Sequence, residues 1–200
     1  TDIMIRSVVL QVCFLAITFQ GAALGDVTLA ANQILYQFFT ISAYALDGFA
    51  FASEALVGAA IGARNRTALR RAAVLGSVWG LTVVGLLSLV YWVFGAQLIG
   101  LMTTADDVVA TALIYLPWCV LAPAIGLPAF MLDGVFIGAT RTRDLRNMMI
   151  LSALIYFACL FPLVAAFGNH GLWGALVVFF IARAVTLGWK YPALERDAEG

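Results

Sequence analysis

Long apolar runs alternate with short polar breaks along the whole chain. The breaks are rich in Gly, Asn and Asp, as in Gly25-Asp26, Asp106-Asp107 and the segment "GNHG" at 168–171. A helix that crosses a bilayer needs about 20 mostly apolar residues. The pattern therefore predicts six transmembrane helices, at residues 3–24, 27–63, 69–94, 108–139, 145–167 and 172–191.

The composition favours a membrane protein over a soluble domain. Of the 200 residues, 64% are hydrophobic and 11% are charged, and the mean hydropathy is +1.01. A soluble domain has about 25% charged residues. A transmembrane β-barrel would show segments of about ten residues with alternating polarity, whereas these runs are longer and uniformly apolar. We therefore expect an all-α membrane protein. The zero net charge gives no indication of a nucleic-acid partner.

Basic residues occur only in alternate connections, and this predicts the orientation. They flank the second and fourth connections and lie near both ends, whereas the first, third and fifth connections contain no Lys or Arg. Because positively charged loops stay in the cytoplasm, we expect both ends to be cytoplasmic. These residues are Arg6, Arg64, Arg66, Arg70, Arg71, Arg141, Arg143, Arg146, Lys190 and Arg196.

The fourth run contains Pro117, Pro123 and Pro128. Proline inside a helix removes a backbone hydrogen bond and kinks the helix. The three prolines therefore predict a bent helix, which either acts as a hinge or only shapes the packing. The three cysteines lie inside apolar runs without metal-ligand spacing, so we interpret them as buried apolar residues.

Four charged residues lie well inside the predicted helices, away from their ends. They are Asp47, Glu54, Asp133 and Arg183, and such residues normally face the interior of the bundle and have a partner. Counting from the nearest basic residue at the helix end, Glu54, Asp133 and Arg183 lie at about 15, 12 and 10 Å depth respectively. We therefore expect Arg183 to pair with Asp133 or Glu54, or to bridge both.

Asp47 lies about 10 Å further outward than Glu54 on the same helical face. It has no basic partner at that depth, so it is a candidate to bind and release a proton or a sodium ion, or it only packs. Tyr44 and Phe51 share this face and are candidates to line a cavity. Gln33 and Gln37 either line the same cavity or form hydrogen bonds between helices.

Three segments resemble the C-terminal half of multidrug and toxic compound extrusion (MATE) transporters, in the branch named for DNA-damage-inducible protein F. They are "TFQGAALGDVTLAANQIL", "SAYALDGFAFASEALVGAAIGA" and "MLDGVFIGATRTRDLRNMM", and "GNHGLWGAL" before the last run also fits. The resemblance implies six transmembrane helices that form the C-terminal lobe of a twelve-helix transporter. The chain also begins with Thr1-Asp2 and has no signal-peptide pattern, so we expect a part of a longer protein.

The resemblance also implies a function. Family members export amphipathic, often cationic, drug-like compounds in exchange for protons or sodium ions, through a cavity that opens alternately to each side. It implies a bacterial inner membrane location, an N-terminal six-helix lobe as partner, and no cofactor besides the transported ion. Asp133 matches an acidic position on the family's tenth helix, and Asp47 and Glu54 match its eighth.

Other functions remain open at this point. A lipid or polysaccharide-precursor flippase of the same superfamily would carry more basic residues in its cavity, whereas Arg183 is the only basic residue that lies well inside a predicted helix, away from its ends. A membrane scaffold without transport activity is a second alternative. An intramembrane aspartyl enzyme is disfavoured because Asp47 and Asp133 are expected at different depths, so we expect no enzyme.

Overall fold

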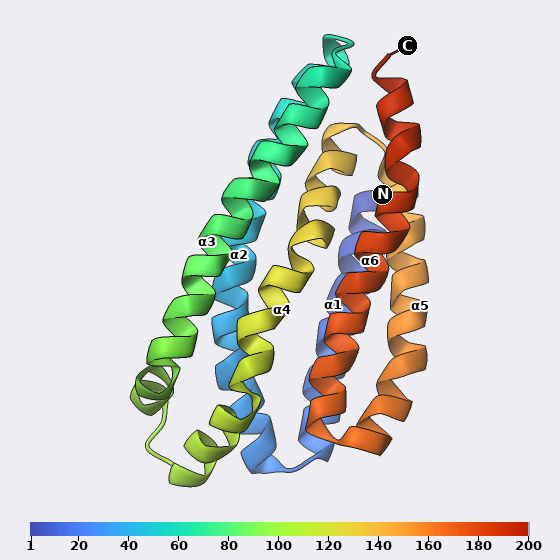
Figure 1. The fold of residues 1–200 in the computed structure, drawn as a ribbon. Coiled ribbons are helices and arrows are strands. Elements are labelled where there is room, and N and C mark those ends of the chain that lie inside the picture. Colours follow the sequence, from blue (N-terminus) through green and yellow to red (C-terminus); the bar gives the residue numbers. More distant parts are fainter. Residues whose placement is uncertain (200) are drawn as a thin grey trace.

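The computed structural model describes residues 1–199 as a bundle of six helices that run up and down (Figure 1). Both termini lie toward the same end of the bundle as the α2–α3 and α4–α5 connections. All six helices are long and apolar enough to cross a membrane, which confirms the predicted all-α, multi-pass membrane protein. The helices are α1 Asp2–Ala23, α2 Asp26–Gly62, α3 Arg66–Met102, α4 Asp106–Gly138, α5 Thr142–Phe167 and α6 Asn169–Asp197.

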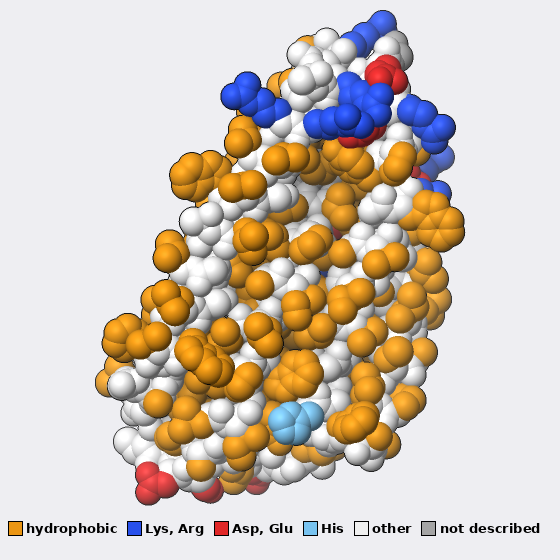
Figure 2. Space-filling view, in the orientation of Figure 1, with side chains coloured by type: hydrophobic (Ala, Val, Ile, Leu, Met, Phe, Trp, Pro, Cys, Tyr) orange, Lys and Arg blue, Asp and Glu red, His pale blue; other side chains and the backbone are white. Residues whose placement is uncertain are grey.

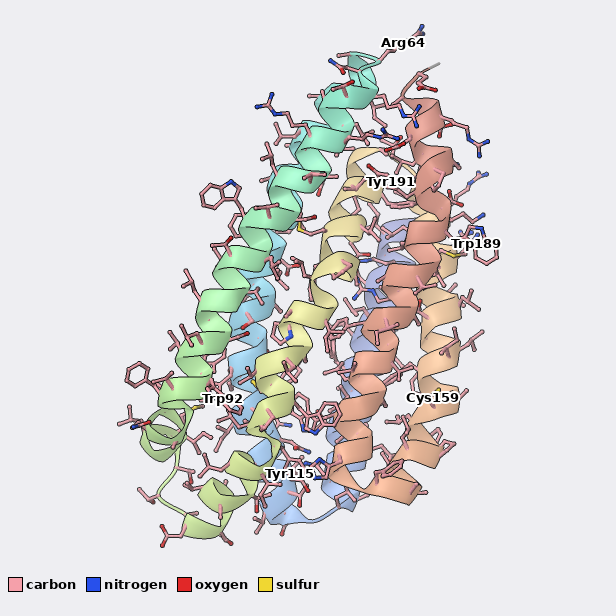
Figure 3. All side chains as sticks on the ribbon, in the orientation of Figure 1. Arg64, Trp92, Tyr115, Cys159, Trp189 and Tyr191 are labelled. Carbon is pink, nitrogen blue, oxygen red and sulfur yellow. The ribbon has the colours of Figure 1, made fainter. Side chains whose placement is uncertain are left out.

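Basic side chains gather at one end of the bundle. Figure 2 shows Lys and Arg at that end together with some acidic side chains, acidic side chains at the opposite end, and a broad hydrophobic surface between the two ends. Large apolar side chains lie exposed on this surface, and Trp189, which is 85% exposed, projects away from the bundle (Figure 3). Such a surface is stable only in contact with lipid or another apolar partner.

Two helices extend well beyond the predicted membrane spans. α3 continues past Phe94 to Met102, and its last turns bend out of line with the rest of the helix (Figure 1). Gly95 lies within the helix and provides room for Leu116 of α4: a Cβ atom at Gly95 would lie 2.5 Å from Leu116 Cδ2. α6 continues through Pro192 to Asp197, and its last turn is held by Glu195, which accepts hydrogen bonds from Arg66 and Arg70 of α3.

The backbones of α2 and α4 approach each other closely at two glycines. A Cβ atom at Gly134 would lie 2.4 Å from the carbonyl oxygen of Ala50, and one at Gly138 would lie 2.4 Å from that of Glu54. Only glycine permits this distance, as expected where transmembrane helices pack through small residues. The contact places the acidic face of α2 beside Asp133 of α4.

α4 remains one helix despite its three internal prolines. Ser88 of α3 donates a 2.8 Å hydrogen bond to the carbonyl oxygen of Val120, in the turn that precedes Pro123. Side chains of neighbouring helices commonly satisfy backbone groups that proline disturbs in a membrane. The hinge function of Pro117, Pro123 and Pro128 stays a prediction.

Candidate functional site

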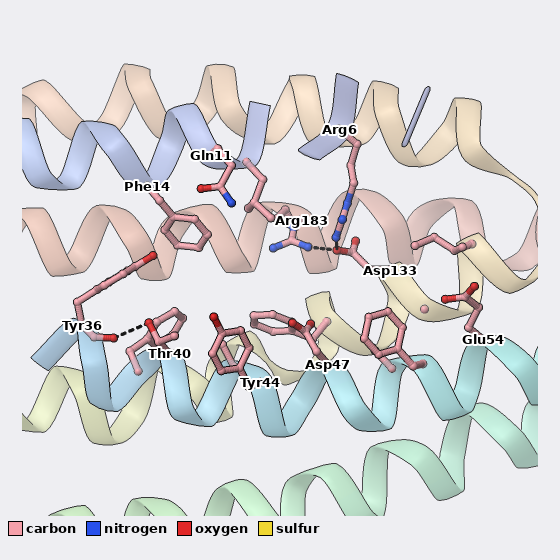
Figure 4. A pocket seen from close by; sticks show the side chains of 18 residues that line it. Arg6, Gln11, Phe14, Tyr36, Thr40, Tyr44, Asp47, Glu54, Asp133 and Arg183 are labelled. Carbon is pink, nitrogen blue, oxygen red and sulfur yellow. Dashed lines mark hydrogen bonds and ion pairs between the residues drawn. The ribbon is translucent and has the colours of Figure 1, made fainter. Parts of the chain in front are cut away.

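A cavity of about 270 Å³ lies between α1, α2, α4 and α6 and contains most of the ionisable side chains inside the bundle. Figure 4 shows Arg6 and Arg183 converging on Asp133 on one side of the cavity, with Asp47, Glu54 and the aromatic residues of α2 across from them. Charged, polar and aromatic side chains from four helices therefore meet at this cavity.

Asp133 is the centre of a buried ion-pair network. Its Oδ2 atom accepts hydrogen bonds from Arg6 of α1 and Arg183 of α6. Asp133 and Arg183 are 4% and 2% exposed, so both charges are removed from water. A buried charge at this depth is stable only when it is paired, and both arginines therefore depend on Asp133 for a counter-charge.

The environment of Arg183 is aromatic as well as acidic. Its guanidinium carbon lies 5.7 Å from the ring centroid of Phe130, 5.5 Å from that of Phe179 and 5.9 Å from that of Phe180. Cations are attracted to the faces of aromatic rings at this distance. The rings therefore hold the guanidinium group in place beside Asp133.

Not every hydrogen-bonding atom of the network is satisfied by the protein. The Oδ1 atom of Asp133 and the Nε atoms of Arg6 and Arg183 are buried and have no hydrogen-bond partner within residues 1–199. Buried polar groups are nearly always paired with protein or ordered water. These three atoms are therefore the places where water or a ligand gains hydrogen bonds.

Asp47 and Glu54 differ from Asp133. Both line the cavity, and neither forms an ion pair in the described part of the chain. The position of both carboxylates at the cavity follows from the helical spacing of α2. Residues 40, 44, 47, 51 and 54 recur every three or four positions and therefore share one face. That face carries Thr40, Tyr44 and Phe51 to the cavity.

Carboxylates outnumber guanidinium groups in the cavity by one. Three acidic side chains, Asp47, Glu54 and Asp133, face two basic ones, Arg6 and Arg183. Both arginines are engaged by Asp133. When all five groups are ionised, the excess charge is negative and lies on the α2 side.

Some of the predicted site residues line the cavity and others do not. The expected pairing of Arg183 with Asp133 is present, and Tyr44 and Phe51 line the cavity as expected. Gln33 and Gln37 do not line it: both are exposed, and Gln33 borders a separate small pocket beside Asn32 and Trp173. Residues 33 and 37 precede Thr40 by seven and three positions and so continue the spacing of the cavity face, but Gln33 lies about 10 Å further toward the start of α2.

One cavity residue was missed by the sequence analysis. Arg6 was interpreted only as a cytoplasmic charge, yet it reaches Asp133. Gln11 of the same helix also lines the cavity. The available signal was the presence of polar side chains in an apolar helix, since such side chains tend to point inward in a transmembrane helix.

Comparison with known proteins identifies the family of the chain. The family model described as MatE matches residues 3–161, well over half of the chain. The chain belongs to the MatE family. It is 44% identical over 194 residues to DNA damage-inducible protein F of Escherichia coli (strain K12), a match that covers 94% of this chain and 41% of that protein. This similarity confirms the predicted MATE family and branch.

More distant relatives span bacteria and plants. The chain is 29% identical to a probable multidrug resistance protein NorM of Rhizobium meliloti (strain 1021), over 86% of this chain and 39% of that protein. It is 27% identical to Protein DETOXIFICATION 42 of Arabidopsis thaliana, over 94% of this chain and 36% of that protein. The MATE chain thus spans about two fifths of the length of these relatives.

Proposed function

We propose that this MATE chain is the C-terminal lobe of a cation-coupled multidrug antiporter, which exports amphipathic or cationic compounds. Its similarity to DNA damage-inducible protein F and to multidrug resistance proteins supports export as the activity. An N-terminal lobe of six further helices would complete the transporter. The six-helix chain and its two-fifths coverage of the relatives are consistent with that arrangement.

The observation that carries the proposal is the excess carboxylate of the cavity. Asp47 faces the cavity without an ion-pair partner in residues 1–199, beside Tyr44 and Phe51. An unpaired carboxylate away from water is stabilised by binding a proton or a monovalent cation. Asp47 is therefore our candidate for the coupling ion, with Glu54 as a second carboxylate on the same face.

Asp133 has a different role in this proposal. Since it already binds Arg6 and Arg183, it holds α1, α4 and α6 together at one depth. A ligand shifts a conformational equilibrium only through a difference in its affinity for the two states. Ion binding at Asp47 changes the charge that faces this network, and in the proposal that change biases the lobe between inward-facing and outward-facing states.

The substrate class follows from the cavity walls. A cationic or amphipathic compound is attracted to the excess carboxylate and packs against Phe14, Tyr36 and Tyr44. Cations bind favourably to aromatic faces. Competition between the substrate and the coupling ion for the same negative charge gives exchange of one for the other.

The orientation is part of the proposal. The basic end of the bundle, which carries both termini (Figures 1 and 2), would lie in the cytoplasm of a bacterial inner membrane, since cytoplasmic segments carry an excess of Lys and Arg.

A flippase for phosphate-bearing lipids is the second candidate, because the cavity contains two arginines rather than one. Asp133 engages both guanidinium groups, however, and this leaves less positive charge for a phosphate. The antiporter therefore fits the cavity better.

The test is transport by the full protein in proteoliposomes. Efflux of a cationic dye driven by a proton or sodium gradient should fall to background in Asp47→Asn. The matched control is Asp106→Asn, which removes a carboxylate at the opposite end of the bundle from the basic residues and should transport normally. Gradient-driven efflux that survives in Asp47→Asn would overturn the assignment of Asp47.

A further inference from the structure

A second concavity lies on the outer surface of the bundle, at the basic end. It is an open groove of about 490 Å³ between the last turns of α2 and the first turns of α3. Alanines form most of it, and the larger apolar side chains are Leu56 and Leu75. We call these residues the α2–α3 groove: Leu56, Ala59, Ala60, Ala63, Asn65, Ala68, Arg71, Ala72 and Leu75.

The α2–α3 groove faces away from the central cavity. Around the axis of α2, Leu56, Ala59 and Ala63 are rotated by about 120–180° from Asp47, at 3.6 residues per turn. The groove therefore opens on the side of α2 that does not carry the acidic residues. Leu56 and Leu75 are 57% and 45% exposed, so this surface is available to the bilayer.

Arg71 is the charged side chain of the groove. It is exposed and makes no ion pair or hydrogen bond with the rest of residues 1–199. The neighbouring arginines differ in this respect, because Arg66 and Arg70 both donate to Glu195 of α6. The lining contains no carboxylate, so the positive charge of Arg71 at the groove remains available to an anion.

We propose that the α2–α3 groove binds an anionic phospholipid. One acyl chain lies along the alanines and leucines, and the headgroup phosphate is held by Arg71. Anionic lipids concentrate in the cytoplasmic leaflet, and basic pockets between transmembrane helices on that side bind their headgroups. The assignment of the groove to the cytoplasmic leaflet depends on the proposed orientation, whereas the existence of the groove and its positive charge does not.

Lipid retention by the full protein tests this directly. Native mass spectrometry in detergent should show phosphatidylglycerol adducts that survive at collision energies where phosphatidylcholine has dissociated. Arg71→Gln should lower the bound phosphatidylglycerol by about fivefold, the effect expected of one basic residue near an anionic surface. The matched control, Arg196→Gln, removes an exposed arginine of α6 that does not line the groove and should retain the lipid.

A second pair of variants tests the groove separately from the charge. Ala59→Phe fills the groove and keeps Arg71, so it should also lower the retained phosphatidylglycerol. Val185→Phe, at a 63% exposed position of α6, adds the same ring elsewhere on the apolar surface and should change nothing. Equal retention of both lipids, or equal loss in Arg71→Gln and Arg196→Gln, would overturn the proposal. Because retention is measured without transport, its failure leaves the antiporter proposal standing, and the reverse also holds.

Discussion

Asp133 compensates charges from two other helices, so its removal should be more harmful than that of either arginine. Asp133→Asn leaves Arg6 and Arg183 without their shared counter-charge, whereas each arginine substitution leaves one ion pair intact. Breaking a buried pair costs about 3–5 kcal/mol. We expect thermal melting of the detergent-purified full protein to rank Asp133→Asn below Arg183→Met.

The pairing itself is tested by the double variant. Arg183→Met together with Asp133→Asn should lose less stability than the sum of the single losses, because each substitution removes a charge that the other one deprives of its partner. Lys190→Met, which removes an exposed charge from α6, serves as control and should melt with the native protein. Strictly additive losses would show that the two side chains do not interact.

At the residue scale, sequence alone predicts part of this network. Counting depth from Lys190 and Arg141 brought Arg183 and Asp133 to one level, and the structure pairs them. Arg6 was missed because an arginine near the start of an apolar run has the same sequence pattern as a cytoplasmic anchor. Whether its side chain points inward depends on the rotation of α1 against α4 and α6, which hydrophobicity does not specify.

At the scale of elements, the contact between α2 and α4 depends on two glycines. A methyl group at Gly134 would lie 2.4 Å from the carbonyl oxygen of Ala50, so Gly134→Ala forces the helices apart. Overpacking of this kind costs about 1–3 kcal/mol. We expect a lower melting temperature and a smaller monodisperse fraction in size-exclusion chromatography.

Gly85→Ala of α3 provides the control for this prediction. A Cβ atom there meets nothing within 4 Å, and alanine is a better helix former than glycine. This variant should be neutral or slightly more stable. If Gly134→Ala behaves in the same way as Gly85→Ala, the close approach of α2 and α4 is not required for folding.

The basic ends of α3 and α6 are joined by Glu195, beyond the apolar part of α6. Hydrogen bonds from Arg70, and then from Arg66, lower the pKa of Glu195 from 4.5 to about 2, against burial, which raises it. Since the folded-state pKa is depressed, the stabilisation is fully present above about pH 4.5 and is lost as the pH falls toward about 2.

This linkage gives a measurable pH dependence. The melting temperature of the native protein should fall as the pH drops from 4.5 toward 2. Glu195→Gln should remove the part of that fall that comes from the bridge, and should already be less stable at neutral pH. Identical pH profiles for the two proteins would mean that Glu195 does not stabilise the junction.

At the scale of the whole molecule, the six helices were predictable because the apolar runs are long and the basic residues alternate. The helices differ from the predicted spans where they bend or continue: α3 past Gly95, and α6 through Pro192. Both extensions contact neighbouring helices, since Leu116 of α4 occupies the space at Gly95, and Arg66 and Arg70 of α3 hold the turn after Pro192. The shape of the cavity depends on such tertiary contacts and could not be inferred from the apolar pattern.

The central claim is that the cavity carries one excess carboxylate, and that Asp47 exchanges its ion for the substrate. Proton release on addition of a cationic substrate, followed with a pH indicator in weakly buffered full protein, tests this most directly. We predict release by the native protein and by Asp106→Asn, and none by Asp47→Asn, although substrate still binds with reduced affinity. Equal proton release by Asp47→Asn and the native protein would contradict the account.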